Sequence, residues 1–418
     1  MQDLFQLICA QEMLAHCATF APLAEERVPL GAARGRVLSK DVHSPAALPP
    51  FARSIMDGFA VRASDIAGCS DSEPTLLQLC GEIMMGESGS SRSLATGQCL
   101  RIWTGGKLPQ DADAVVMLED TKFHSPDTLA VFRPVTPGSN IIHAGEDYSQ
   151  DSLVLSKGHQ LRPQDLGLLA GLGIREVAVH QRPKVAILST GDELVPVEQT
   201  PSGGQVRDIN STILAALVEE VGGMAQFLGI CKDNLIALQH RCCQALDRTD
   251  MILLSGGSSM GRRDFTHRVF SSLPDSELLV HGVSARPGKP AILAKRGNQA
   301  LLGLPGHAAS AMVVFYLVAR PLLRRLLGLT AGHGLTPLEV VTARQISSPI
   351  GREDYVRVRL LPAKHGGPPL AEPIYAKPGL LNSLVRANGL LPIARDSQGL
   401  EAGESAWVLL FPHIPHIS

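Results

Sequence analysis

The sequence predicts a multidomain α/β protein with a doubly wound α/β domain, a β-rich module and a C-terminal β domain that resembles a barrel. Strand-like apolar runs alternate with helical runs over 182–328, which is the pattern of a parallel sheet covered by helices. Short runs separated by glycine, proline and serine fill 45–150 and 337–418, as in β modules. The length of 418 residues allows about two to four domains.

The expected elements follow in order along the chain. The N-terminal region is predicted to form an amphipathic helix over 2–17 and a second helix over 31–40, before the segment PAALPPF. In the α/β region, Asn210 is predicted to cap a helix that Gly222 ends. The other predicted strands lie at 184–189, 225–230 and 250–255, and the other helices at 234–247, 263–273 and 307–328.

Composition excludes several classes of protein. The net charge is −2, aromatic residues make up 4%, and no long basic run occurs, so we expect no nucleic-acid binding. The longest uncharged segment, between Arg296 and Arg320, contains the turn residues Gly303, Pro305 and Gly306, so we expect no membrane span. The first residues do not follow the signal-peptide pattern, since Asp3 stands where a basic residue would be expected and Glu12 interrupts the apolar stretch. No CxxC pair occurs among the cysteines, so we expect a cytoplasmic protein with reduced thiols.

Three polar loops follow predicted strands of the α/β region: STGDEL (189–194), SGGSSMGRRD (255–264) and GLPGHAAS (303–310). In a doubly wound sheet, ligands bind outside the carboxyl ends of the strands, so the loops are expected to face one crevice. Asp192 and Glu193 in the first loop could hold Mg²⁺, which prefers oxygen ligands, or could cap a helix.

The second and third loops suit anions. The glycine-rich loop offers backbone N–H groups to a phosphate, although a turn that needs glycine would look the same. It is not a P-loop, because Arg262 and Arg263 replace the Lys-Ser/Thr pair. The GLPGHAAS loop precedes a helix, and Arg286 and Lys289 of RPGKP add two cations for an oxyanion.

Three further loops belong to the β-rich region: SIMDGFA (54–60), RIWTGGKLP (101–109) and HAGEDYS (143–149). Each places an acid or a hydroxyl beside glycine, which turn chemistry alone could explain. The histidines His143, His159 and His307 have no HxxxH partner, so a zinc site is not expected.

Taken together, these segments resemble the molybdopterin molybdenumtransferase family, the MoeA type that includes the E domain of gephyrin. The resemblance rests on seven motifs in the family order, spread over roughly residues 1–415: MDGFAV, RIWTGGKLPQDADAVVMLE, PGSN…GEDYS, ILSTGDEL, LLSGGSSMGRRDF, RPGKP and GLPG. It implies an elongated homodimer with four regions per chain. These are a split N-terminal segment (1–44 and 146–180), an inserted β-rich module (45–145), a molybdopterin-binding α/β domain (181–330) and a C-terminal β domain (331–418).

The resemblance also implies a reaction, in which molybdate and adenylylated molybdopterin give molybdenum cofactor and AMP with Mg²⁺. The implied catalytic residues are Asp57, Thr104, Asp147, Glu193 and Asp264, and the implied metal ligands are Asp192, Glu193 and Asp264. The implied substrate-binding residues are Thr190, Gly191, Asp233, Ser255, Gly256, Gly257, Ser258, Arg286, Lys289, Pro305, Gly306 and His307.

The chain departs from the family pattern near the expected anion pocket. PGHAAS, with His307 and Ala308, stands where the family commonly has PGNPVS, and Gly282 and Ile142 stand where basic residues are common. These departures leave open a preference for tungstate over molybdate, or a paralogue that keeps the fold as a non-catalytic scaffold. A third alternative is the adenylyl transfer step on molybdopterin, for which a lone α/β domain would suffice.

Overall fold

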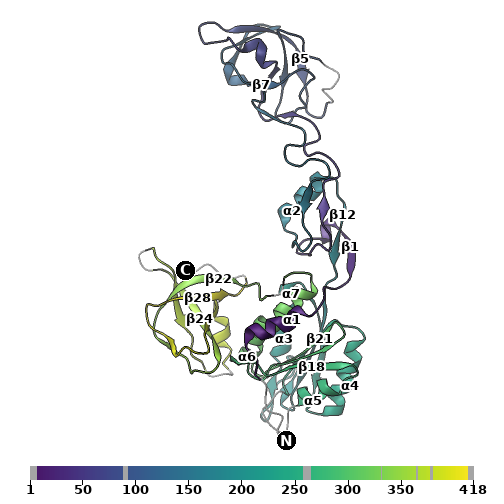
Figure 1. The fold of residues 1–418 in the computed structure, drawn as a ribbon, viewed down its shortest axis with the longest axis vertical. Helices are drawn as coiled ribbons and strands as arrows, with labels where there is room; N and C mark the ends of the chain where they lie inside the picture. The colour runs from purple at the N-terminus through teal and green to yellow at the C-terminus, as the bar shows by residue number, and fades with distance from the viewer. Residues whose placement is uncertain are drawn as a thin grey trace.

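The computed structural model describes residues 7–87, 93–257, 265–330, 332–363, 366–376 and 380–412. The molecule is elongated (Figure 1), with the β-rich module that contains β5 (Thr75–Ile83) and β7 (Ala114–Met117) at one end and the α/β domain at the other. Between them lie α2 (Pro163–Gly171) and the antiparallel pair β1 (Glu25–Pro29) and β12 (Glu176–His180). Among the described residues, no helix has both the length and the apolar character that a membrane crossing requires.

A six-stranded sheet with the order β16-β13-β17-β21-β20-β18 forms the centre of the α/β domain. The first four strands are parallel, as the sequence predicts. Strand β20 runs antiparallel to both of its neighbours, β21, to which a tight turn joins it, and β18, so that β18 has the direction of the first four strands. The strand bounds are β13 (Lys184–Thr190), β16 (Met224–Cys231), β17 (Met251–Ser255), β18 (Ser276–His281), β20 (Ile292–Arg296) and β21 (Gln299–Leu304).

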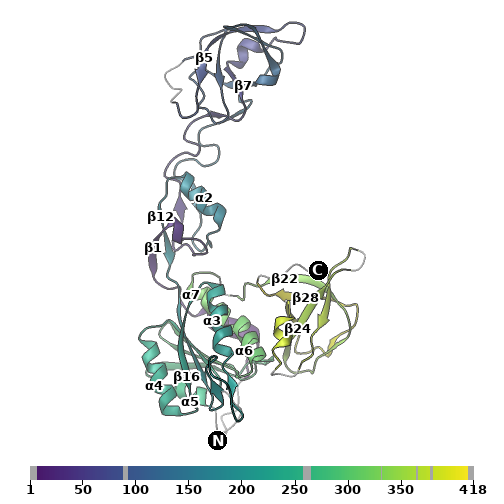
Figure 2. The ribbon, with the colours of Figure 1, turned by 180° about the vertical axis from the view of Figure 1, so that it is seen from behind.

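Helices cover both faces of this sheet, which confirms the doubly wound fold. Alternate residues of β13 show the two faces: Val185 and Ile187 pack into one core, and Ala186 and Leu188 into the other. The first core receives α1 (Ala10–Ala18), α3 (Asn210–Val221), α6 (Ala308–Val314) and α7 (Arg320–Leu326). The second receives α4 (Leu235–Leu246) and α5 (Phe265–Ser272), which Figure 2 shows on the opposite side of the sheet.

Two details of the predicted α/β helices differ in the structure. The helix predicted over 307–328 is continuous from α6 to α7, but its middle turn, Phe315–Ala319, is π-helical and not α-helical. Asn210 is the first residue of α3 and not its cap, because its side chain turns to the neighbouring loops. The Asp208 carboxylate instead accepts the backbone N–H of Ser211 at 3.1 Å, and Gly222, with φ of 106°, ends the helix as predicted.

The predictions for the N-terminal helices were partly wrong. Residues 2–6 of the helix predicted over 2–17 lie outside the described residues, and within the described part α1 begins at Ala10, because Ile8 pairs with Val283 in an isolated β-bridge. No α-helix forms over 31–40: a 3₁₀ helix spans only Leu30–Ala32, and Val37 and Leu38 form isolated β-bridges with Gln160 and Val179. Gly35 adopts a φ of 74°, which a helix cannot contain. The apolar residues of this segment therefore pack by long-range pairing.

The β-rich module contains a six-stranded sheet with the order β7-β4-β6-β5-β9-β8. Two short antiparallel pairs, β3 with β10 and β2 with β11, lie on the path between this sheet and α2. The remaining bounds are β2 (Val42–His43), β3 (Arg53–Ser54), β4 (Gly58–Val61), β6 (Gln98–Ile102), β8 (Thr121–Ser125), β9 (Thr128–Val131), β10 (Ile141–Ile142) and β11 (Leu153–Leu155). The exact boundaries of the four predicted regions stay a prediction.

The C-terminal region is a closed five-stranded barrel, which confirms the predicted architecture. Its strands pair in the order β24-β25-β22-β28-β26, and β26 pairs back with β24. A short strand of the α/β region, β19 (Ala285–Arg286), adds to β24 and ties the two parts together. The barrel strands are β22 (Thr336–Thr342), β24 (Glu353–Leu361), β25 (Leu370–Pro373), β26 (Gly389–Ile393) and β28 (Ser405–Leu410).

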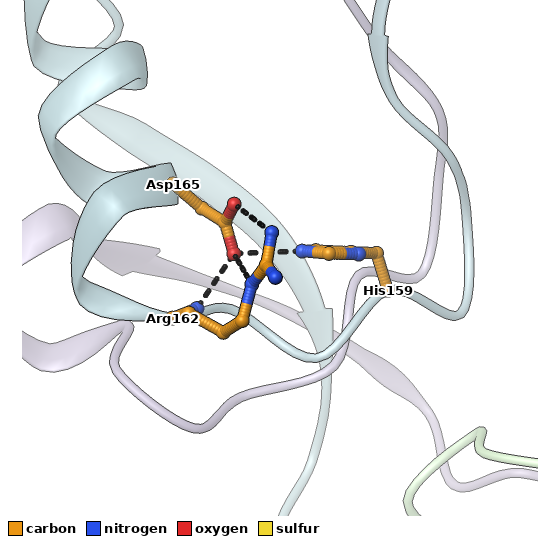
Figure 3. A network of polar contacts seen from close by, with 3 residues as sticks. All are labelled: His159, Arg162 and Asp165. Carbon is orange, nitrogen blue, oxygen red and sulfur yellow. Dashed lines mark hydrogen bonds and ion pairs between the residues drawn. The ribbon is translucent and has the colours of Figure 1, made fainter.

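A charged network fixes the start of α2 (Figure 3). The buried carboxylate of Asp165 accepts the backbone N–H of Arg162 at 2.8 Å and two guanidinium N–H groups of Arg162 at 3.0 Å. His159 Nε2 lies 2.7 Å from Asp165 Oδ2. The Arg162 guanidinium holds the pKa of Asp165 far below its ordinary value, so this carboxylate stays ionised.

We predict that Asp165→Asn lowers the free energy of unfolding by about 1.5–3 kcal/mol at neutral pH, since charge-assisted hydrogen bonds are lost. The folded-state pKa of Asp165 is depressed, so its stabilisation is complete above the ordinary carboxyl pKa of about 4 and decreases as the pH falls below it. Urea unfolding at pH 7 and in acid measures both effects. The exposed Asp71, changed to Asn, serves as the control, and equal effects of the two substitutions would contradict the assignment.

Candidate active site

A cleft of about 580 Å³ lies at the carboxyl ends of the parallel strands. The loops after β13, β17 and β21 all line it, so the structure brings together the three polar loops that sequence analysis singled out. The segment before α3 forms another wall, and the barrel contributes Leu380 and Leu381. Of the sequence-predicted residues, the lining includes Thr190, Gly191, Glu193, Asp233, Ser255, Gly256, Gly257, Gly306 and His307.

Carboxylates gather at the end of β13. Thr190 Oγ1 donates a hydrogen bond of 2.8 Å to Asp233 Oδ1, and the Asp233 backbone N–H donates one of 3.3 Å to Asp192 Oδ1. The Glu193 carboxylate folds over Gly191, where a Cβ atom would lie 2.8 Å from Glu193 Oε2. Asp192 and Glu193 are both exposed. These oxygens face open space, where a cation could also bind substrate oxygens.

Within the described residues, no group of three His, Cys, Asp or Glu side chains forms a closed metal site. Mg²⁺ usually keeps several waters and binds one or two carboxylates together with substrate phosphates. The exposed oxygens of Asp192 and Glu193 fit this open type of coordination. Asp264, the third predicted ligand, lies outside the described residues, as does Ser258.

The loop after β17 requires glycine. Gly256 and Gly257 have φ angles of 97° and 64°, and a Cβ atom at Gly256 would lie 2.2 Å from the carbonyl oxygen of Thr190. The Gly256 N–H donates to the Leu304 carbonyl at 3.2 Å, and its own carbonyl accepts from Thr266 Oγ1 at 3.1 Å. The loop is therefore clamped between β13 and β21 with its backbone at the cleft.

Asn210 connects these loops, and sequence analysis missed this role. Its Nδ2 donates to Ser255 Oγ at 2.6 Å and to the carbonyl oxygen of Gly306 at 2.8 Å. The residue is 7% exposed and sits at the start of α3. The signal in the sequence was the polar residue Asn210 at the start of an apolar helix, but a role as helix cap explained that residue equally well. Asn210 thus joins the ends of β17 and β21 to α3.

Arg286 lies in a second cleft of about 230 Å³, between the α/β domain and the barrel. Its Nη1 is 3.6 Å from Asp354 Oδ2, and burial raises the pKa of Asp354 while Arg286 opposes that rise. Arg357 and Ser310 line the same cleft, and Arg357 donates to Ser383 Oγ. Ala309 lines both clefts, which therefore adjoin. Lys289 is partly buried on the loop that follows Arg286, and Pro305 is buried below the GLPGHAAS loop.

The catalytic residues predicted in the β-rich module do not reach the cleft of their own chain. Asp57 Oδ1 accepts the backbone N–H of Thr104 at 2.8 Å and its hydroxyl at 2.7 Å, and these hydrogen bonds lower the pKa of Asp57. Both residues are exposed on the module at the far end of the molecule (Figure 1). Asp147 is exposed in the connecting loop, where its N–H donates to the Leu48 carbonyl.

The departures from the family pattern have different settings. His307 precedes α6, lines the cleft and makes no capping hydrogen bond with its side chain. Gly282 is buried with a φ of 104°, so its backbone conformation disfavours the basic side chain that is common there. Ile142 lies in β10, which belongs to the connection to the β-rich module. Of the described departures, His307 and Ala308 line the cleft, and Gly282 and Ile142 do not.

Family models match three parts of the chain: MoeA N-terminal region (domain I and II) at residues 8–173, probable molybdopterin binding domain at 186–325, and MoeA C-terminal region (domain IV) at 339–411. The chain is 30% identical to the molybdopterin molybdenumtransferase of Haemophilus influenzae, over 94% of this chain and 95% of that protein. It is 34% identical to the molybdopterin molybdenumtransferase of a Nostoc species, over 79% of this chain and 76% of that protein.

Among solved structures, the chain is similar to a molybdopterin biosynthesis MoeA protein from Pyrococcus horikoshii, with a TM-score of 0.82 and 32% identity. That match covers 97% of this chain and 99% of the other. The fold, the cleft and these matches define a transferase of molybdenum cofactor biosynthesis. The chain belongs to the MoeA family of molybdopterin molybdenumtransferases.

We predict that Gly256→Ala costs about 1–3 kcal/mol more stability than Gly204→Ala, because only the former drives a Cβ into the Thr190 carbonyl. Both glycines have φ near 90°, but nothing lies within 4 Å of a Cβ at Gly204. Gly204→Ala thus measures the backbone strain alone, about 1 kcal/mol. Denaturant unfolding compares the two variants, and equal losses of stability would show that the loop is not clamped.

Proposed function

We propose that the chain inserts molybdate into adenylylated molybdopterin and releases AMP in an Mg²⁺-dependent step, giving molybdenum cofactor. The observation that carries the proposal is the meeting of carboxylates and a glycine-rich backbone loop in one cleft. Membership of the MoeA family supports the substrate class. The eight cysteines of the chain form no disulfides, which is consistent with activity in the reducing cytoplasm.

The scissile bond in this proposal is the P–O bond of the pyrophosphate between AMP and molybdopterin. A water oxygen attacks one phosphorus atom and the bond from that phosphorus to the bridging oxygen breaks. AMP and the molybdopterin phosphate then separate, and the protons of the water pass to the products and to solvent. Such a step needs charge neutralisation and alignment more than a covalent enzyme intermediate. Mg²⁺, when bound, supplies the neutralisation. The oxygens of Asp192 and Glu193 would hold it, with Asp264 as a further ligand.

The other residues bind and orient the substrate. The Gly256 backbone is held by its own hydrogen bonds, and the partly exposed backbone at Gly257 lines the cleft and suits a phosphate. The hydrogen bond of 2.8 Å to Asp233 fixes the orientation of the Thr190 hydroxyl, so that the side chains at this wall of the cleft are held in place for the substrate. Gly191, Ser255, Ser258, Lys289, Pro305, Gly306 and His307 complete the proposed substrate site.

We place the oxyanion in the adjoining cleft beside Arg286. Two guanidinium groups, those of Arg286 and Arg357, and the Ser310 hydroxyl line this cleft, and they suit a tetrahedral dianion. Molybdate and tungstate have the same charge and shape, so assays with each oxyanion decide between them. Because Ala309 lines both clefts, an oxyanion bound beside Arg286 would lie next to the adenylylated substrate in the main cleft.

We further propose a homodimer in which the β-rich module of one chain completes the cleft of the other. Asp57 and Thr104 form a hydrogen-bonded pair on the exposed surface of that module, far from their own cleft. A twofold interface repeats each contact, so two composite sites would form per dimer. Asp147, in the connecting loop, would act at the same shared site.

We predict that Glu193→Gln lowers Mg²⁺-dependent AMP release from adenylylated molybdopterin about 100-fold or more, because an amide is a poor substitute for a charged ligand. AMP is measured by chromatography across a range of Mg²⁺ concentrations. Glu198→Gln, an exposed acid five residues further on, should leave the rate unchanged. Parent-like turnover by folded Glu193→Gln would remove Glu193 from the metal site, and a parent that releases no AMP would refute the proposed function.

The shared site predicts complementation between two inactive variants, Asp57→Asn and Glu193→Gln. Refolding an equal mixture pairs the chains at random, and about half of the dimers are then mixed. In each mixed dimer one site carries both changes and the other carries neither, so activity should return to roughly a quarter of the parent value. A mixture that contains mixed dimers but stays inactive would show that both residues serve one chain's site.

A further inference from the structure

Among the residues that the structure describes, two buried oxygen atoms beside the cleft have no hydrogen-bond partner: Asp208 Oδ2 and Asn210 Oδ1. Their residues are 3% and 7% exposed and both line the cleft. Buried polar atoms are nearly always paired, because an unpaired one loses its hydrogen bonds to water without replacement. Two unpaired acceptors on one short segment of a ligand cleft therefore indicate that a ligand supplies the donors.

The rest of each side chain is already held in place. Asp208 Oδ1 accepts the Ser211 N–H, and Asn210 Nδ2 donates to Ser255 Oγ and to the Gly306 carbonyl. The Gly306 carbonyl oxygen can only accept a hydrogen bond, so the Asn210 amide must point its NH₂ group toward Gly306. The amide oxygen of Asn210 then points away from Gly306. Both unpaired atoms are thus acceptors, and neither can turn into a donor while these contacts hold.

The surroundings suit a flat heterocycle. Apolar side chains line the cleft beside this segment, among them Val206, Ile209 and Leu381. A phosphate is disfavoured next to the Asp208 carboxylate because both are negatively charged. The phosphate therefore belongs at the glycine loop, and the ring of the same substrate belongs at Asp208 and Asn210.

We propose that Asp208 Oδ2 and Asn210 Oδ1 bind the aminopyrimidinone edge of the pterin ring; this rests on the proposed function. That edge presents two neighbouring donors, the ring N3–H and the 2-amino group, which complement two acceptor oxygens. Adenine, the other ring of the proposed substrate, presents an acceptor nitrogen next to its amino group and would oppose one of the oxygens. Asp208 and Asn210 would therefore determine which of the two rings enters this part of the cleft.

The test compares two probes that differ at one group, 6-hydroxymethylpterin monophosphate and 6-hydroxymethyllumazine monophosphate, whose ring carries an oxygen in place of the 2-amino group. Calorimetry on the full chain should show that the pterin binds about 10-fold to 100-fold more tightly than the lumazine. Asp208→Asn keeps an oxygen for the Ser211 N–H but turns the free position into a donor. In this variant pterin affinity should fall by about the same factor, and the preference should disappear or reverse.

Asp208→Ser is the second variant, because serine also caps helices and leaves no free oxygen. It should weaken pterin binding and leave lumazine binding as in the parent, while inorganic pyrophosphate binds both variants and the parent similarly. A parent that binds the two rings equally, or binds neither, would overturn the inference, as would parent-like pterin binding by both folded variants. Ring preference is measured without turnover, so its failure is distinct from a failure to release AMP.

Discussion

The parallel register of β13, β17 and β21 is the constraint on which the cleft depends. Ser189 pairs with Ser255, and Ser255 with Leu304, so the three strands end level with one another. Their loops must therefore start at the same edge of the sheet. The close approach of Gly256 to Thr190 follows from this register, since only a residue without Cβ lets the second loop cross the end of β13.

The sequence predicted the elements whose pattern is local. The strands at 184–189 and 250–255 are apolar and end in glycine loops, so their parallel arrangement and the crevice that their loops share could be expected from the sequence. The 31–40 segment shows the limit. Its apolar residues look helical, but Val37 and Leu38 pair with Gln160 and Val179, more than a hundred residues away. No local pattern encodes such a partner.

The same limit applies to the site. The loop residues Thr190, Glu193 and Gly256 could be nominated from the sequence because they follow strands. Asn210 could not be distinguished from a helix cap, since its two hydrogen-bond partners lie 45 and 96 residues further along the chain. Arg286 lies in the adjoining cleft because β19 adds to the barrel strand β24, a pairing between domains that residue spacing does not reveal.

The two clefts differ in the charge of the side chains that line them. Among the described residues that line the main cleft, acids outnumber the basic side chains, which are Arg207 and His307. A polyphosphate there must depend on backbone N–H groups and on a bound cation. The smaller cleft is lined by Arg286 and Arg357 and, among the described residues, by one carboxylate, that of Asp354, whose pKa is raised by burial. A free oxyanion would be repelled from the first cleft and attracted to the second. Under the proposed function, this separation would keep the two negatively charged substrates apart until the one in the main cleft has lost AMP, and they would then meet near Ala309, which lines both clefts.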